Sequence, residues 1–317
     1  MRRLSSKIQL GKFLFDYVCE VEVQSSYETL TDTCTIKVPQ RLHWRTQKLV
    51  AGSTPLLKKG DKVKVELGYN ERYNTVFEGY ITGIKPDKPI TILCEDAMWL
   101  LKQKVVTKSY AKVSLSTLLM DISPLPFEAA RVNLGKFRIS KATVAQVLDT
   151  LRKDYGLRAF VQNGVLKVGF PFIPDVARQV GQRLFSFQEN IISHDLIYQK
   201  EDDIKIRVNG ISIMPNNKKE KVQAGDTEGE LRTIHKYAMS KADLQKFCEA
   251  EVKRLKFEGY RGKFTTFGEP FTKVTDYIRL QDSEFPERAG DYMVKSMTYK
   301  FGQGGYRQEI EPSLKVS

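Results

Sequence analysis

The chain has 317 residues, of which 41% are hydrophobic and 28% are charged, and its formal net charge is +13. This length favours two to four compact units that hold enough apolar material to fold without disulfides or metals. No segment approaches the roughly 18 apolar residues of a membrane span, and residues 1–9 lack the uninterrupted apolar stretch of a secretory signal, so neither a membrane span nor export by that route is expected.

The positive charge is compatible with an acidic partner, whether nucleic acid, an anionic membrane surface or an acidic protein face. The basic residues are scattered along the chain, with short clusters at Lys58-Lys59 and Lys218-Lys219. A basic surface that faces solvent is therefore the simpler interpretation.

Residues 1–105 are predicted to form a first β unit, because apolar and polar residues alternate in several short segments. The predicted strands are 16–24, 33–38, part of 59–69, 76–84 and 90–94. Pro39 ends the second of them, because proline cannot donate to a strand ladder. Five closely spaced strands favour a small antiparallel barrel or sandwich, which a helix at 95–101 completes. The stretch 39–59 is interpreted as an irregular loop.

Residues 106–182 are interpreted as an inserted α+β domain, because helical spacing appears beside strand patterns. A short helix is expected at 114–122. A second helix is predicted after Thr143, which caps its first turn, and ends at Gly156, the residue type that most readily adopts the left-handed conformation at a helix end.

A hairpin is predicted to follow within the inserted domain. Asn163-Gly164 separates the apolar segments 157–162 and 165–170. Both residues of this dipeptide readily adopt positive φ, which a tight turn between antiparallel strands requires. The exit from the domain is expected at Pro171, Pro174 and Gly181.

Residues 183–317 return to strand patterns, most clearly at 203–209. The stretch 210–230 is rich in Gly, Asn, Lys and Glu and is predicted to be an exposed loop. One long helix is expected over 240–258, with Ser240 as its cap. The last predicted strands are 262–268, 276–281, 292–301 and 306–310, and a glycine-rich turn at 302–305 joins the final pair. This range is interpreted as a second β unit that carries one long helix.

Three segments near each end of the chain share an order of strand, loop, strand, turn and strand. They are 60–65, 79–84 and 90–95 in the first unit and 275–280, 292–297 and 306–311 in the last. Few residues are identical, so duplication of one β unit and chance similarity between β segments are both open explanations.

Signatures of catalysis and metal binding are missing from the sequence. His43, His194 and His235 are far apart and lack the spacing or the flanking cysteine pair of a zinc site. Nucleophile elbows, phosphate-binding loops and dinucleotide fingerprints are absent as well. We therefore predict no catalytic, cofactor or metal residues and no enzyme activity.

The four cysteines are Cys19, Cys34, Cys94 and Cys248, and they form no Cys-x-x-Cys pair. Three of them occupy positions with an apolar pattern. Buried free thiols that pack as small hydrophobic groups are expected, with disulfides or metal ligation as the alternative.

Two groups of neighbouring carboxylates, Glu95-Asp96 and Glu201-Asp202-Asp203, could bind a hard cation or transfer protons. Both stand at strand boundaries, where roles in turns and helix caps already explain them. A glycan hydrolase would need two spaced carboxylates that face a cleft, and the sequence identifies no such pair.

Aromatic residues stand near basic ones at Tyr69, Tyr73, Phe77 and Tyr80, close to Arg72. They could form a stacking platform for single-stranded nucleic acid. The simpler interpretation is that alternating aromatic residues build the core and rim of a β unit. The patch 254–261, with Lys256, Phe257 and Tyr260, has the same two interpretations.

Three parts of the chain together resemble the phage tail hub family, which includes late control protein D, the hub proteins of Mu-like phages and the hub part of type VI secretion spikes. The first part is Gly-Asp-Lys-Val at 60–63, running into Gly-Tyr at 68–69 and then 77–84. The second is Cys-Glu-Asp-Ala-Met-Trp-Leu-Leu at 94–101, and the third runs from Gly-Asp-Tyr at 290–292 to Gly-Tyr-Arg-Gln at 305–308. The match spans nearly the whole chain in order, although each motif is short.

The resemblance implies a mainly β fold in which two related small antiparallel β-barrels flank a central α+β region. It implies a homotrimer, in which six barrels form a pseudo-sixfold ring that adapts the tail tube to a central spike in the baseplate of a contractile phage or prophage tail. The implied partners are the tube protein, the spike and other baseplate components, with nucleic acid only in transit. Assembly is expected in the bacterial host cytoplasm. Because the chain ends soon after the second β unit, we expect the spike to be a separate protein.

Two other functions are compatible with the sequence. The first is a basic β-barrel protein that binds nucleic acid, which the net charge and the aromatic residues near basic ones would support. The second is a tail-associated cell-wall hydrolase, for which no carboxylate can be nominated. A filter-binding titration against salt would identify the nucleic-acid-binding protein. Loss of hydrolysis in a carboxylate variant would identify the hydrolase.

Overall fold

The computed structural model describes residues 3–39, 57–169, 183–214, 216, 218–256 and 258–315. The fold is mainly β, with 55% strand and 17% helix, as predicted. Most of the predicted loop at 39–59 and the exit residues Pro171, Pro174 and Gly181 lie outside the described residues. Within the described part, no helix is both long and apolar enough to cross a membrane.

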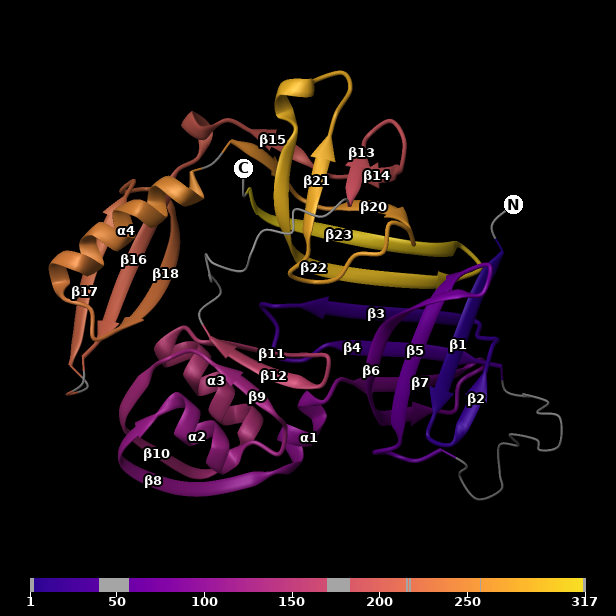
Figure 1. The fold of residues 1–317 in the computed structure, drawn as a ribbon, viewed down its shortest axis with the longest axis horizontal. Helices are drawn as coiled ribbons and strands as arrows, with labels where there is room; N and C mark the ends of the chain where they lie inside the picture. The colour runs from indigo at the N-terminus through magenta and orange to yellow at the C-terminus, as the bar shows by residue number, and fades with distance from the viewer. Residues whose placement is uncertain are drawn as a thin grey trace.

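The first seven strands form one run of antiparallel neighbours in the order β3-β4-β7-β6-β5-β1-β2 (Figure 1). They are β1 Leu4–Leu10, β2 Phe13–Phe15, β3 Glu20–Ser26, β4 Thr33–Val38, β5 Lys62–Tyr69, β6 Arg72–Lys85 and β7 Ile90–Glu95. The period-two pattern has the expected effect, because Val63, Val65 and Leu67 are all buried on one side of β5. The sequence did not predict β1, since two of its buried residues are serines, Ser5 and Ser6, whose hydroxyls bond to the Glu71 amide and the Asp16 carbonyl.

The last strands form a second antiparallel run in the order β14-β20-β23-β22-β21, and β13 lies parallel to β21. They are β13 Leu184–Ser186, β14 Ile191–His194, β20 Phe264–Phe267, β21 Tyr277–Gln281, β22 Gly290–Gly302 and β23 Gly305–Lys315. The tight pairing of Gly302 with Gly305 confirms the predicted glycine-rich turn.

Where two separate barrels were expected, the two runs of strands join in one sheet of 13 strands. The junction is the antiparallel pair β22–β3, with Ser296 opposite Ser26 and Gly302 opposite Glu20. β22 is longer than the predicted strand, so one of its edges holds β21 over its first residues and β3 over its last. No closed barrel is found in the described part of the chain, and both ends contribute to one hydrophobic core.

The two runs of strands nevertheless repeat one arrangement. β5, β6 and β7 form an antiparallel meander, and so do β21, β22 and β23. β4 then lies beside β7 as β20 lies beside β23, and β3 lies beside β4 as β14 lies beside β20. The segments that matched weakly in sequence therefore occupy equivalent places in the strand order. The strands at opposite edges of each run are also consecutive in the chain, β2 with β3 and β13 with β14.

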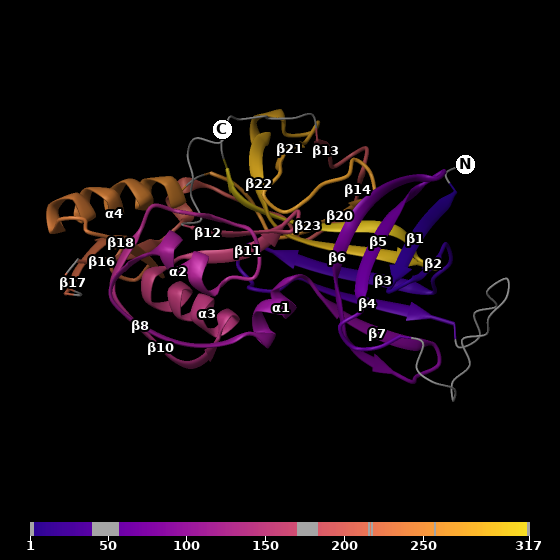
Figure 2. The ribbon, with the colours of Figure 1, turned by 60° about the horizontal axis from the view of Figure 1, so that its bottom comes forward.

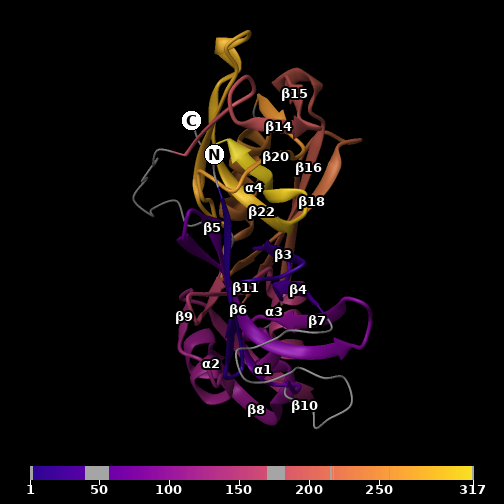
Figure 3. The ribbon, with the colours of Figure 1, turned by 90° about the vertical axis from the view of Figure 1, so that its right-hand side faces the viewer.

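The inserted unit has its own hydrophobic core and lies at the opposite end of the molecule from the last strands (Figure 3). Its elements are α1 Met98–Gln103, β8 Val105–Ser114, α2 Leu115–Ile122, β9 Phe127–Ala129, β10 Asn133–Thr143, α3 Val144–Tyr155, β11 Arg158–Gln162 and β12 Val165–Gly169. The local predictions are confirmed: Thr143 forms a capping box with Gln146, Gly156 ends α3 at φ 68°, and Asn163 and Gly164 turn at φ 52° and 77°.

A third small core lies within the range that was interpreted as the second β unit. It is built from β16 Ile206–Ile213, β17 Lys219–Gly225, β18 Glu230–Tyr237 and α4 Lys241–Leu255. Figure 2 shows α4 on one face of this three-stranded sheet. The predicted helix 240–258 is thus α4, with Ser240 as its cap, but it covers β16 and β17 rather than the large sheet. Short elements connect this unit to the large sheet: β15 Ile197–Gln199, η1 Glu201–Asp203 and β19 Gly259–Arg261. A further short helix, η2 Pro286–Arg288, lies between β21 and β22.

The prediction of an exposed loop at 210–230 was wrong. This stretch holds the end of β16, all of β17 and the first residue of β18. Gly210 does not mark a turn: it stands in mid-strand, and a Cβ built there would lie 2.3 Å from the Cys248 Sγ atom. The glycine therefore allows close packing of α4 on the strand.

Candidate functional site

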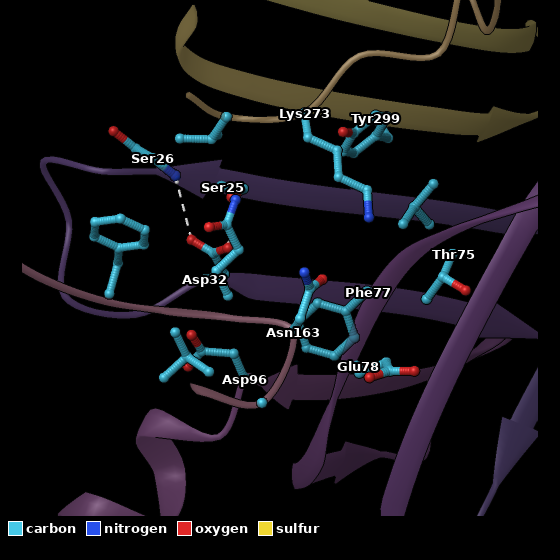
Figure 4. Close-up of a pocket in the computed structure, with 16 residues that line it drawn as sticks. Ser25, Ser26, Asp32, Thr75, Phe77, Glu78, Asp96, Asn163, Lys273 and Tyr299 are labelled. Atoms are coloured by element: carbon cyan, nitrogen blue, oxygen red, sulfur yellow. Dashed lines mark hydrogen bonds between the residues drawn. The ribbon is translucent and has the colours of Figure 1, made fainter. Parts of the chain in front are cut away.

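A small cavity of about 140 Å³ lies where the first strands, the inserted unit and the last strands meet (Figure 4). The β3–β4 turn and β6 form one side of it. The start of α1 and the tip of the β11–β12 hairpin form another, and the loop before β21 closes it with Lys273 and Val274. The cavity is thus the place where the three parts of the chain are held together.

Two carboxyl groups, from Asp32 and Asp96, line this cavity. The Asp32 carboxylate accepts a hydrogen bond from the Ser25 hydroxyl at 2.5 Å and one from the Ser26 amide at 3.2 Å. The Asp96 Oδ1 atom accepts from the Met98 amide at 3.0 Å, which satisfies one of the free amides at the start of α1. The Asp96 amide in turn donates to the Asp32 carbonyl at 3.1 Å, so the two residues are linked directly.

Burial makes both carboxyls weak acids. It raises the pKa of Asp32 to about 6, although the bonds from Ser25 and Ser26 oppose the shift. Burial also raises the pKa of Asp96 to about 8, and the neighbouring charge of Asp32 raises it further. Neither group forms an ion pair with a described residue. Because its pKa is raised to about 8, Asp96 is mostly protonated at neutral pH.

The remaining walls are built from neutral groups, the cation Lys273 and the acid Glu78. The Tyr299 hydroxyl donates to the Thr272 carbonyl. Gln162 at the hairpin tip reaches Thr275 at 3.5 Å, which is a weak contact. Figure 4 shows Lys273 and Asn163 extending into the same space as Asp32. This arrangement links one part of the chain to another.

The carboxylates considered in the sequence lie apart from one another. Glu201, Asp202 and Asp203 form η1, where all three are exposed, whereas Glu95 pairs with Lys102 at 2.7 Å. The sequence did not identify Asp32, because a single acid in a turn gives no sign that it will be buried beside another. Over the described ranges, no group of three His, Cys, Asp or Glu side chains could hold a metal ion.

The histidines are also separate. The His194 ring contacts Phe187 edge-on, with 4.8 Å between the ring centroids. His235 Nδ1 lies 2.8 Å from the Asp154 carbonyl at the end of α3, where burial lowers the pKa of the imidazole. His43 lies outside the described residues.

Of the four aromatic residues considered as a stacking platform, two are buried, Tyr80 is partly buried and Tyr73 is exposed. Tyr69 and Phe77 are buried, and the Tyr69 hydroxyl donates to the Tyr306 carbonyl at 3.1 Å. Tyr80 stacks on Trp99, with 5.3 Å between the ring centroids. In the second aromatic patch Tyr260 is buried and Lys256 pairs with Asp226, whereas Phe257 and the Arg254 side chain lie outside the description.

All four cysteines are free thiols, and Cys34, Cys94 and Cys248 are buried as predicted. Cys34 and Cys94 face each other across the β4–β7 pair. Burial raises the pKa of Cys94 to about 12, which keeps the thiol protonated and unreactive.

Comparisons with known proteins identify solved structures that have a similar fold. No protein-family model and no curated protein sequence matches the chain. Among solved structures, the tail protein from Neisseria meningitidis matches with a TM-score of 0.66 and 16% identity, covering 99% of this chain and 97% of that one. The 43 kDa tail protein of prophage MuSo2 from Shewanella oneidensis matches with a TM-score of 0.64 and 14% identity, covering 97% of each chain.

An Escherichia coli component of the type VI secretion system, described as similar to tail proteins of bacteriophage T4, matches with a TM-score of 0.56 and 10% identity over 97% of this chain and 76% of that one. The chain therefore has the fold of phage tail proteins and of a type VI secretion component, and the resemblance predicted from the sequence is confirmed at the level of the fold.

Proposed function

We propose that this protein is a structural baseplate hub protein of a phage or prophage tail. Three copies form a ring with pseudo-sixfold symmetry, because each copy contributes two related β units to it. The ring adapts the tail tube to the central spike, and its other partners are further baseplate components. The protein acts in the virion tail after assembly in the host cytoplasm, and it has no enzymatic role.

The observation that carries this proposal is the repeated strand order. Two sister runs of strands, each with its edge strands consecutive in the chain, are what a subunit needs to place two similar units in a ring. Matches to tail proteins over nearly the whole chain support the same role. The two edge strands of each run lie close in sequence, so each run is proposed to curl into a barrel in the ring.

The mass in solution tests the proposal. Three copies of the 36.3 kDa chain give a particle of about 109 kDa. Light scattering over a concentration series is expected to detect this particle at low and at high salt, because such interfaces bury apolar surface as well as charge. A monomer at every concentration would contradict the ring. We propose no second function, because Tyr69, Phe77 and Tyr260, which favoured nucleic-acid binding, are in the core.

A further inference from the structure

β8 and β10 form a two-stranded antiparallel ribbon on the outside of the inserted unit (Figures 1 and 2). Its inner face packs on the helices through Val113, Phe137 and Ile139, which are buried. Its outer face is polar: Ser109 lies directly opposite Arg138, and both are exposed. Among the described strands, β8 has no neighbour on its second edge, so the backbone groups along that edge are available to another chain.

The ribbon carries a strong excess of positive charge. Residues 104–143 contain seven lysines and arginines but only two acids. Both acids are already neutralised, since Asp121 pairs with Lys108 at 3.2 Å and Glu128 pairs with Lys167 at 3.5 Å. Six of the seven cations are exposed without an ion-pair partner among the described residues: Lys104, Lys112, Arg131, Lys136, Arg138 and Lys141.

The outer face of β8 leaves room for these cations to reach its open edge. The exposed residues Thr107, Ser109 and Ala111 are small. A strand added beside β8 would lie about 10 Å from β10, which is two strand spacings. A glutamate on the added strand and Arg138 on β10 can meet across that distance over Ser109, because both side chains are long.

The same face does not suit single-stranded nucleic acid. The exposed positions between its cations hold no aromatic residue that could stack on bases. Tyr110, the ribbon's tyrosine, is engaged through its hydroxyl with Asp121 at 2.8 Å. An extended protein segment, by contrast, can use both the open backbone edge and the unpaired cations.

We propose that the β8–β10 ribbon is a docking surface for an extended acidic segment of a neighbouring tail component, which adds as a strand to the free edge of β8. The inference rests on the proposed structural role in a tail and names the chemistry of one partner. Lysines along the edge also keep the ribbon from pairing with copies of itself.

The test uses the full-length protein and a fluorescent nine-residue peptide in which glutamate alternates with threonine and valine. A peptide with glutamine in place of glutamate is the first control. The variant Lys136→Glu/Arg138→Glu reverses charge on the ribbon, and the matched variant Lys246→Glu/Lys253→Glu reverses two exposed charges on α4. Circular dichroism and thermal melting establish that both variants fold.

We expect the glutamate peptide to bind, with affinity at least tenfold lower for the ribbon variant and within twofold of the unmodified protein for the α4 variant. Hydrogen exchange of the β8 amides should slow when the peptide is bound. Equal losses in both variants, equal binding of the glutamine peptide, or displacement of the glutamate peptide by a DNA duplex at lower concentration would each overturn the proposal.

Light scattering of the ribbon variant separates this inference from the ring. A ribbon variant that stays at the mass of the unmodified protein while losing the peptide supports docking at a surface separate from the ring interface. A ribbon variant that loses both the assembled mass and peptide binding would contradict a docking surface separate from the ring interface.

Discussion

Replacing Asp96 with asparagine tests whether the cavity between the three parts of the chain holds a protonated carboxyl. Asp96 is only 6% exposed, and its pKa is raised from 3.8 to about 8. Asparagine has nearly the same shape and can still accept the bond from the Met98 amide. The substitution therefore removes the ionisable proton and leaves the packing almost unchanged.

The direction in which stability changes with pH follows from proton binding. A carboxyl whose pKa is higher in the folded state binds its proton more tightly there, so stability is greatest at low pH and falls as pH rises. For Asp96 the loss extends from about pH 4 to about pH 8, and the pKa of Asp32, raised to about 6, adds a loss between about pH 4 and 6. At roughly 1.4 kcal/mol per pKa unit, Asp96 accounts for about 6 kcal/mol over its whole range.

Urea unfolding at pH 5, 6, 7, 8 and 8.5 measures this effect. The unmodified protein should lose stability steadily between pH 6 and 8, whereas Asp96→Asn should lose little there and be more stable by several kcal/mol at pH 8.5. Asp121→Asn is the control, because hydrogen bonds from Tyr110 and Lys108 lower the pKa of that exposed carboxyl and place its titration outside this range. A fall between pH 6 and 8 that persists unchanged in Asp96→Asn would refute the reasoning.

Three further substitutions or reactions have defined outcomes. Gly210→Ala should destabilise the protein by about 1–3 kcal/mol in urea unfolding, because the new methyl group meets the Cys248 sulfur, whereas Gly304→Ala, with open space around it, should change stability little. Tyr306→Phe should keep or slightly raise the melting temperature, because the buried Tyr306 hydroxyl has no hydrogen-bond partner among the described residues, and a drop of several degrees would contradict this. In the native protein iodoacetamide should modify Cys19 and no other cysteine, and mass spectrometry that finds a second modified thiol would show that a buried cysteine is accessible.

Local features of the fold could be predicted from the sequence because neighbouring residues determine them. Thr143 and Gly156 delimit α3, and Asn163-Gly164 forms the turn between β11 and β12. The bonds and φ values that produce these features involve only residues close in sequence. The strands with strict alternation, such as β4 and β5, follow from the burial of one face. In each case the signal and the structure it produces lie within a few residues of each other.

Other features depend on contacts between distant segments. The β8–β10 ribbon was missed because its exposed polar residues hide the alternation. Gly210 suggested a loop, whereas α4, which packs on it, comes more than 30 residues later. The pairing of Ser26 with Ser296 joins the two ends of the chain, and no local pattern indicates that these two edges meet.

The candidate site was predictable only in part for the same reason. The sequence directed attention to Asp96 as one of two adjacent acids, and a capping role was expected for it. Its partner Asp32 comes from another turn, and the two become neighbours only once β4 and β7 pair. The raised pKa values arise from that pairing and from burial, which composition does not reveal.

Electron microscopy of the purified protein tests the central claim most directly, because it shows how many similar units each copy contributes. Class averages are expected to show a ring of three copies with six similar lobes, two from each chain. Averages in which each subunit gives a single lobe, or particles that never close into rings at any concentration, would contradict the account.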